Sequence, residues 1–277
     1  MRTDLLKQIL AVPTKTNTEH QMVAFLAKYC KKHGINFVTD EHRNCYIVKG
    51  IADCYPCVMA HTDSVHSMND KTIKEDNGIL RAYNKDDQQI GIGGDDICGI
   101  FICLELLEAF DTIKVALFAG EERGCIGSRQ ANPLFFRDVG YAMEFDSPGS
   151  DTMSYSNSGV KMFADDGEFI TKALPSLDRY GVTKWQNHPW TDTLQIREKF
   201  GFQCLNLPAG YYRFHTPEEY VVLADVQNSI LLGHELISTL GNRSYYAPVE
   251  RTSVKKASSP RPIMPFCSFP DSPLLKV

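Results

Sequence analysis

Two adjacent glutamates, Glu121 and Glu122, directly follow the apolar run IKVALFA at residues 113–119. The run has the length and composition of a buried strand, and charge directly after such a strand is typical of a sheet edge or of the mouth of a site. Neighbouring side chains there can point in different directions, so the two carboxylates could serve two different tasks. The ordinary alternative is a solvated first helical turn, where glutamate is favoured.

Four further segments place an imidazole or a carboxylate at the end of a predicted strand or in the loop beyond it. In open α/β sheets this edge is where ligands bind. Taken singly, each such residue has an ordinary explanation as a loop residue or a helix cap. Together they predict one shared site, which contains His61 and Asp63 in HTDSV, Asp95 and Asp96 in GGDDICG, Asp146 in EFDSPG, and His215 in FHTPEEY.

Two imidazoles and three carboxylates are the ligands that a two-metal hydrolytic site needs. Zinc takes nitrogen and oxygen ligands near tetrahedral geometry, and a catalytic site keeps one position open for water. A bridging carboxylate holds two metals roughly 3.5–4 Å apart, close enough to share a hydroxide. In the HxD spacing, Asp63 can accept the second ring N–H of His61 and fix its tautomer. One member of the glutamate pair would then bind metal while the other acts as general base.

The elements that must position these residues alternate along the chain. Strands interleaved with helices predict an α/β fold, a three-layer sandwich with a mixed, mostly parallel central sheet covered by helices on both faces. We expect helices at residues 4–10, 19–32, 96–110, 166–173, 192–200 and 224–240, strands at 45–50, 56–61, 113–119, 140–145 and 203–208, and a hairpin at 71–84.

The domain organisation follows a change of composition at Gly241. Residues 1–240 are predicted to form one catalytic domain, and residues 241–277 a Pro/Ser-rich tail that either lies on the domain or is disordered.

The net charge of −5 gives no electrostatic reason to expect nucleic acid or an anionic membrane as a partner. No apolar run approaches the roughly 18 residues of a membrane span. The N-terminus lacks a signal-peptide pattern, so we expect a cytoplasmic protein. The nine cysteines are scattered, and reduced thiols suit that compartment. Cys54 and Cys57 form a lone CxxC, for which a structural zinc is the weaker interpretation.

The five motifs HTDSV, GGDDICG, GEERGCIGS, EFDSPG and HTPEEY, in this order, resemble those of the dizinc exopeptidases. This superfamily includes bacterial aminopeptidases, tripeptidases, dipeptidases and N-acyl amino acid hydrolases, and the resemblance covers about residues 4–240. It implies a metallopeptidase with two zinc ions, with cobalt or manganese as alternatives. The implied substrate is a small peptide or an N-acyl amino acid.

The resemblance also implies a role for each residue of the predicted site. One metal would be bound by His61 and Asp146, the other by Glu122 and His215, with Asp95 as the bridge, Asp63 orienting His61, and Glu121 as the catalytic base.

Three of these assignments depend on the pattern of the family. Asp95 is preferred to Asp96 because the motif is written D-D-x-x-G with the first aspartate bridging. Asp146 is preferred to Glu144 because the family's ligand lies at the very end of its strand, and Glu144 stays an alternative. The segment PWTDTLQIREKFG resembles a stretch that lines the substrate cleft, so Asp192 is a candidate for contact with the polar end of the substrate.

The chain departs from many relatives in the segment between Asp146 and His215, where they carry a lid or dimerisation domain. Here 69 positions separate the two residues, and predicted core elements fill them. A single-domain plan removes the usual dimer interface, so we expect a monomer. Two alternatives stay open: an N-acyl amino acid deacylase or amidase at the same site, and a non-catalytic binding protein on the same fold. The presence of every ligand type and of Glu121 argues against the second.

Overall fold

The centre of the fold is a mixed sheet whose four innermost strands run parallel. The computed structural model describes residues 1–66, 70–188 and 191–251. Within these residues the sheet has nine strands in the order β1-β2-β7-β3-β8-β12-β9-β10, with β11 paired to β9, and antiparallel pairs lie toward its margins. The strands are β1 (Asn36–Thr39), β2 (Cys45–Lys49), β3 (Tyr55–His61), β7 (Ile113–Phe118), β8 (Val139–Ser147), β9 (Thr152–Asn157), β10 (Val160–Lys161), β11 (Lys184–His188) and β12 (Cys204–Pro208).

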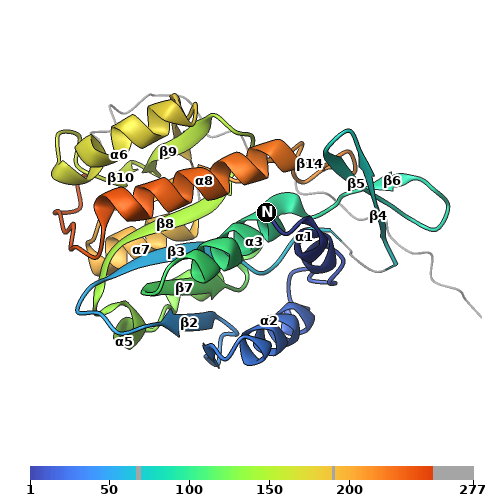
Figure 1. Cartoon of the computed structure of the whole chain (residues 1–277), viewed down its shortest axis with the longest axis horizontal. Coiled ribbons are helices and arrows are strands. Elements are labelled where there is room, and N and C mark those ends of the chain that lie inside the picture. The colour runs from blue at the N-terminus through green and yellow to red at the C-terminus, as the bar shows by residue number, and fades with distance from the viewer. Residues whose placement is uncertain (67–69, 189–190, 252–277) are drawn as a thin grey trace, which may run out of the picture.

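Helices cover both faces of this sheet, as the alternation along β3 shows. Val58 and Ala60 belong to one apolar cluster, whereas Cys57 and Met59 belong to another on the opposite face. The first cluster includes residues of α1, α2, α3, α6 and α8, and the second includes residues of α5 and α7. Figure 1 shows α3 and α8 crossing the same face. The helices are α1 (Thr3–Leu10), α2 (His20–Lys32), α3 (Gly94–Ala109), α4 (Ile126–Arg129), α5 (Pro133–Phe136), α6 (Glu168–Arg179), α7 (Asp192–Phe200) and α8 (Leu223–Leu240).

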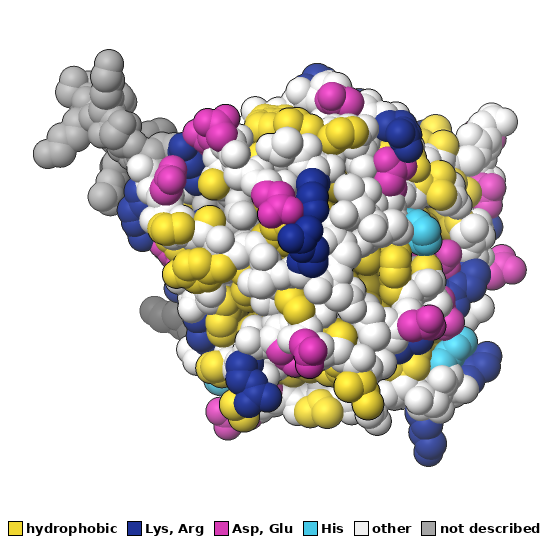
Figure 2. Space-filling model, turned by 60° about the vertical axis from the view of Figure 1, so that its left-hand side comes forward, with side chains coloured by type: hydrophobic (Ala, Val, Ile, Leu, Met, Phe, Trp, Pro, Cys, Tyr) yellow, Lys and Arg dark blue, Asp and Glu magenta, His cyan; other side chains and the backbone are white. Residues whose placement is uncertain are grey.

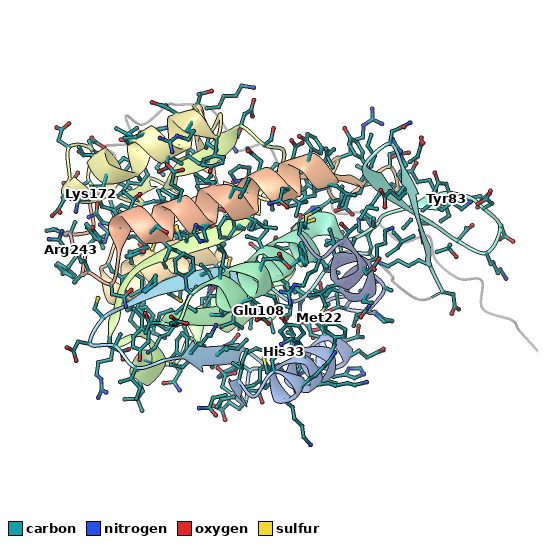
Figure 3. All side chains as sticks on the ribbon, viewed as in Figure 1. Met22, His33, Tyr83, Glu108, Lys172 and Arg243 are labelled. Carbon is teal, nitrogen blue, oxygen red and sulfur yellow. The ribbon has the colours of Figure 1, made fainter. Side chains whose placement is uncertain are left out.

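This arrangement confirms the predicted three-layer α/β sandwich. Helix α3 is the central element of one layer, and the side chains from Ile97 to Leu104 are all buried, as expected of a helix enclosed between a sheet and other helices. Near the end of α3, Glu108 lies 3.0 Å from His33, the residue that follows α2, and both are labelled in Figure 3. The Asp95–Asp96 peptide bond at the start of α3 is cis.

A small second sheet projects from the body beside α1 and α8 (Figure 1). It contains β4 (Thr72–Asp76), β5 (Ile79–Tyr83), β6 (Gln89–Ile90), β13 (Tyr211–Tyr212) and β14 (Tyr220–Val222). The predicted hairpin is β4–β5, and Asn77 and Gly78 at its turn both have positive φ, as a type I′ turn requires. The sequence did not indicate that β14 pairs with β5, where Val221 lies opposite Leu80.

Several edge elements differ from prediction. Strands β1, β9, β10 and β11 were not expected, because they are short or polar at the sheet margins and lack a continuous apolar run. Helix α6 extends to Arg179, well past the expected end at residue 173, and contains Pro175.

The chain after α8 packs on the domain as far as the structure describes it. Tyr245 is buried, and the buried guanidinium of Arg197 donates to the carbonyl oxygens of Ala247 at 2.9 Å and Pro248 at 2.8 Å. The first part of the predicted tail therefore lies on the domain, and residues 252–277 lie outside the described residues. The division after residue 240 stays a prediction.

The surface carries mixed charges. On the face shown in Figure 2, acidic, basic and hydrophobic side chains are interspersed, without an extended field of one sign. In the described parts of the chain, no helix is both long and apolar enough to cross a membrane.

Candidate metal centre

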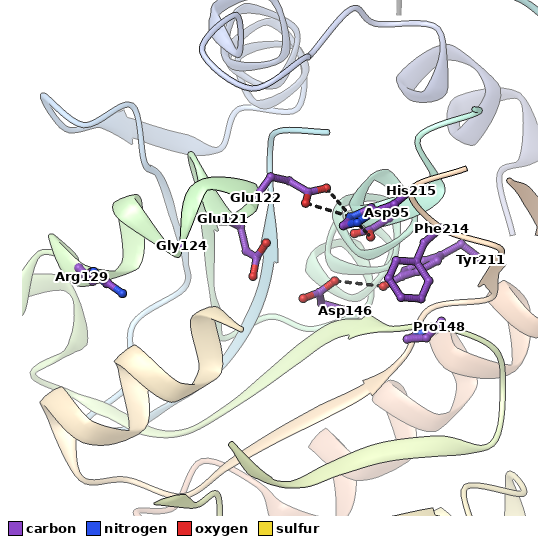
Figure 4. A pocket seen from close by; sticks show the side chains of 10 residues that line it. All are labelled: Asp95, Glu121, Glu122, Gly124, Arg129, Asp146, Pro148, Tyr211, Phe214 and His215. Atoms are coloured by element: carbon purple, nitrogen blue, oxygen red, sulfur yellow. Dashed lines mark hydrogen bonds and ion pairs between the residues drawn. The ribbon is translucent and has the colours of Figure 1, made fainter. Parts of the chain in front are cut away.

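The predicted site residues come together at the carboxyl ends of the central parallel strands. His61 ends β3, Glu121 and Glu122 form a 3-10 turn after β7, and Asp146 lies near the end of β8. Two residues reach this edge from elsewhere: Asp95 from the start of α3, and His215 from the loop between β13 and β14. Figure 4 shows several of them around one cavity.

His61 is enclosed by carboxylates. Its side chain is 1% exposed, Nδ1 lies 3.4 Å from Asp63 Oδ1, and Nε2 lies 3.1 Å from Asp95 Oδ1 and 3.6 Å from Asp146 Oδ1. Burial alone would lower its pKa, but the interactions with Asp146, Asp63 and Asp95 raise the pKa well above its ordinary value. Asp63 is thus the carboxylate nearest Nδ1, but this ring nitrogen makes no hydrogen bond among the described residues, and the orienting role of Asp63 stays a prediction.

His215 faces the other side of the cluster. Its Nε2 lies 3.2 Å from Asp95 Oδ2 and 2.9 Å from Glu122 Oε2. Hydrogen bonds to Asp95 and then to Glu122 raise the pKa of His215 to about 10. Glu122 is thus the member of the glutamate pair that turns toward a histidine.

Asp95 lies between the two histidines and offers one oxygen to each. Oδ1 faces His61 and Oδ2 faces His215, and these hydrogen bonds lower the pKa of Asp95 against the opposing effect of burial. The neighbouring Asp96 instead accepts the backbone N–H groups of His61 and Gly99, both at 3.1 Å. Asp95 therefore lies between the two histidines, and the oxygens of Asp96 are engaged with the backbone.

Asp146 and Glu144 lie at different depths. Asp146 lines the cavity and accepts the hydroxyl of buried Tyr211 at 3.1 Å, an orienting contact that the sequence did not indicate. Glu144 is fully buried and accepts the N–H of Thr193 at 2.8 Å as well as its hydroxyl. The geometry supports Asp146 rather than Glu144 as the ligand.

Glu121 lines the cavity beside the metal-ligand candidates. Its N–H donates to Asp63 Oδ1 at 3.0 Å, which links the turn after β7 to the aspartate behind His61. Burial raises the pKa of the Glu121 carboxyl to about 10, and the negative charges of Asp146 and Asp192 add to this effect. A nearby dication would lower that pKa.

The donor set fits divalent metal ions. His61, Asp95 and Glu122 have ligand atoms within 4.8 Å of one another, and so do His61, Asp96 and Asp146. Burial raises the pKa of Glu122, because a cluster of desolvated carboxylates is unfavourable without compensating cations. Nitrogen and oxygen donors of this kind suit zinc, cobalt and manganese. Cys54 and Cys57 belong to neither group.

Asp192 lies behind the cavity rather than on its wall. It is fully buried, its Oδ1 accepts the hydroxyl of Ser128, and burial raises its pKa to about 7. This position does not support the predicted contact with substrate.

Glu219 is a residue that sequence reasoning missed. It is fully buried, it accepts the N–H groups of Gly93 at 2.7 Å and Asp95 at 3.0 Å, and its Oε2 lies 3.0 Å from His66 Nε2. Glu219 therefore holds the turn that presents Asp95. In the sequence, Glu219 is the second glutamate of the motif HTPEEY, and within that motif a role was predicted only for His215.

The cavity has a volume of about 490 Å³, within the range of roughly 300–1,000 Å³ common for small-molecule sites. Its middle is formed by the carboxylates and His215. In Figure 4, Tyr211, Phe214 and Pro148 lie toward one end, and Arg129 lies at the other.

Comparisons with known proteins give the fold. No family model and no curated protein matches the sequence. Solved structures do match. The aminopeptidase PepT from Bacillus cereus is 14% identical, with a TM-score of 0.73 over 86% of this chain and 97% of that chain. A tripeptidase from Staphylococcus aureus is 13% identical, with a TM-score of 0.72 over 85% and 96%. The TET1 peptidase from Pyrococcus horikoshii is 13% identical, with a TM-score of 0.63 over 84% and 98%.

The chain therefore has the fold of the exopeptidase class that its motifs resemble. At these identities the likeness shows the fold alone, so the activity rests on the residues of the site.

Proposed function

We propose that this chain is a metal-dependent hydrolase that cleaves a peptide bond near a chain end, of the aminopeptidase or di/tripeptidase type. The observation that carries the proposal is the position of Asp95, whose two oxygens face His61 and His215 separately. A carboxylate shared between two imidazole-containing donor groups is what a dinuclear site requires.

The residues proposed to hold the two ions all lie in the described part of the chain. His61 and Asp146 would hold one ion, Glu122 and His215 the other, and Asp95 would bridge them. When bound, two zinc ions, or cobalt or manganese, supply a water of lowered pKa and polarise the substrate carbonyl.

Glu121 is the proposed general base. It would accept a proton from the attacking water and then deliver that proton to the nitrogen of the leaving amine as the C–N bond breaks. Its place on the cavity wall beside Asp146 and Asp95 suits this transfer. Asp63 would keep the tautomer of His61 fixed through the 3.4 Å contact to Nδ1.

The assembly and location of the chain stay predictions. The TET1 peptidase can assemble into a tetrahedron or an octahedral shell, so a chain of this fold can form large assemblies. We expect a monomer here, and sedimentation of the purified chain tests that expectation. Fractionation of cells tests the predicted cytoplasmic location.

The first experiment is elemental analysis of the purified wild-type chain and of His61→Ala, combined with a peptide-hydrolysis assay before and after chelation. We expect close to two metal ions per wild-type chain, at least one fewer in the variant, and hydrolysis that chelation removes and metal restores. A wild-type chain that takes up no zinc, cobalt or manganese would contradict the proposal.

A further inference from the structure

We propose that Arg129 binds the α-carboxylate of the amino acid or short peptide that leaves on hydrolysis. The site would then select substrates with a free carboxyl group close to the scissile bond. This inference rests on the function proposed above and names the substrate class within it.

The charge of the cavity wall is the first observation. Of the described residues that line the cavity, Arg129 is the one with a permanent positive charge. The carboxylates in the middle of the cavity are the proposed ligands of the metal ions, so the metal-bound water and the scissile carbonyl would take that space. A guanidinium binds a carboxylate through two parallel N–H···O bonds, which makes the Arg129 end of the cavity the favoured place for such a group.

The position of Glu121 gives the direction of the substrate. Figure 4 shows Glu121 between Arg129 on one side and the group of Asp146, His215 and the aromatic side chains on the other. Glu121 must reach the leaving nitrogen to protonate it. The leaving part of the substrate therefore extends from Glu121 toward Arg129.

The opposite end of the cavity suits the acyl part of the substrate. Tyr211, Phe214 and Pro148 form an apolar wall there. Apolar side chains and acyl chains are favoured against such a wall, whereas a carboxylate is not. The two ends of the cavity thus differ in the chemistry that they accept.

The backbone of Arg129 is held in place by its neighbours. Arg129 ends α4, its N–H donates to the Cys125 carbonyl at 3.2 Å, and its own carbonyl accepts Lys199 Nζ at 3.2 Å. The preceding Ser128 hydroxyl donates to buried Asp192 at the start of α7. Helix α4 is therefore fixed against α7, while the Arg129 side chain lies exposed at the mouth.

This chemistry is shared by two kinds of substrate. A dipeptide and an N-acyl amino acid release the same free amino acid, so both present the carboxylate to Arg129. They differ in the acyl part, which would lie against the aromatic end. Peptide amides lack the negative charge and should gain nothing from Arg129.

The test compares the dipeptide Ala-Ala, its C-terminal amide, and N-acetylalanine with wild type, Arg129→Met and Arg129→Lys. Hydrogen bonds to a charged group contribute about 1.5–3 kcal/mol, so we expect a roughly 10–100-fold preference of wild type for the free dipeptide over its amide. Arg129→Met should raise KM for the free acid until the preference disappears, and should leave the amide unchanged. Arg129→Lys should retain part of the preference.

The matched control is Arg137→Met, an exposed arginine outside the cavity, which should behave as wild type. Two outcomes would overturn the role of Arg129 but leave the proposed hydrolase function standing. One is equal hydrolysis of Ala-Ala and its amide by wild type, and the other is an equal loss of activity on both substrates in Arg129→Met. Hydrolysis of none of the three substrates by metal-loaded wild type would overturn the proposed function itself. A preference of wild type for N-acetylalanine over Ala-Ala would support the carboxylate-binding role of Arg129 and would identify N-acyl amino acids as the substrate class.

Discussion

The two histidines of the site stand in contrasting surroundings. His61 is 1% exposed at the end of a central strand, with carboxylates at both ring nitrogens. His215 is 43% exposed in a loop, has a φ of 61°, and meets carboxylates through Nε2 alone among the contacts described. One half of the site is part of the sheet, and the other depends on a loop.

Because of this difference, we expect the two proposed metal positions to differ in affinity. An ion at His61 would be held by side chains fixed through buried hydrogen bonds, and such support typically strengthens binding. An ion at His215 would be nearer solvent and would exchange sooner. Asp95 belongs to both halves and couples them.

The largest effect is expected for Glu121→Gln, because this variant removes the proposed general base. Turnover should fall by about 10²–10⁴-fold, since a general base is lost, while metal content and thermal unfolding stay near wild type. Steady-state kinetics and elemental analysis measure this. Wild-type turnover in the variant would remove Glu121 from the mechanism.

His61→Ala and His215→Ala test whether the two halves of the site differ. Each variant should bind about one ion fewer, but His61→Ala should also lower the free energy of unfolding, by about 1–3 kcal/mol, because it leaves buried carboxylates without a partner. His215→Ala should unfold close to wild type. Elemental analysis and denaturant titration distinguish them, and equal stability losses would show that the two halves are alike.

Asp63→Asn tests the support behind His61. The amide no longer fixes the His61 tautomer as a carboxylate does, so affinity for one of the two ions should fall by about 10–100-fold. The other ion should be unaffected. Competition with a chromophoric chelator resolves the two affinities, and a uniform loss at both positions would speak against a local role.

Glu219→Gln should have the smallest effect. It weakens two charge-assisted hydrogen bonds to the turn that presents Asp95, so we expect kcat to fall by about tenfold or less with KM little changed. Glu218→Gln, at the adjacent exposed glutamate, is the control and should behave as wild type. If both variants lose the same activity, the contact to Gly93 and Asp95 is not responsible.

Much of the fold could be predicted because its central strands are continuous apolar runs between helical patterns. The run that ends at His61 could be recognised from composition alone, and so could the strand before Glu121. Strands β9 and β11 could not be recognised from the sequence. Their polar residues adopt a strand conformation because they pair at the margin of the sheet.

The candidate site was predictable to the extent that each residue follows a strand or begins a helix. What a side chain does inside the cluster depends on depth, which no local pattern reports. Asp192 lies behind the cavity and Glu219 beneath the turn of Asp95, and both positions result from contacts between segments far apart in the sequence.

The pairing of β14 with β5 has a consequence for the synthesis of this chain. His215 lies in the loop that leads into β14, and β14 pairs with β5 of the hairpin in the first third of the chain. Contacts between distant segments form late in folding, because the loop they close must first be ordered. A growing chain that has emerged only as far as β12 lacks His215 and Glu219. It cannot assemble the site, so a peptidase activity would appear only after synthesis has passed residue 222.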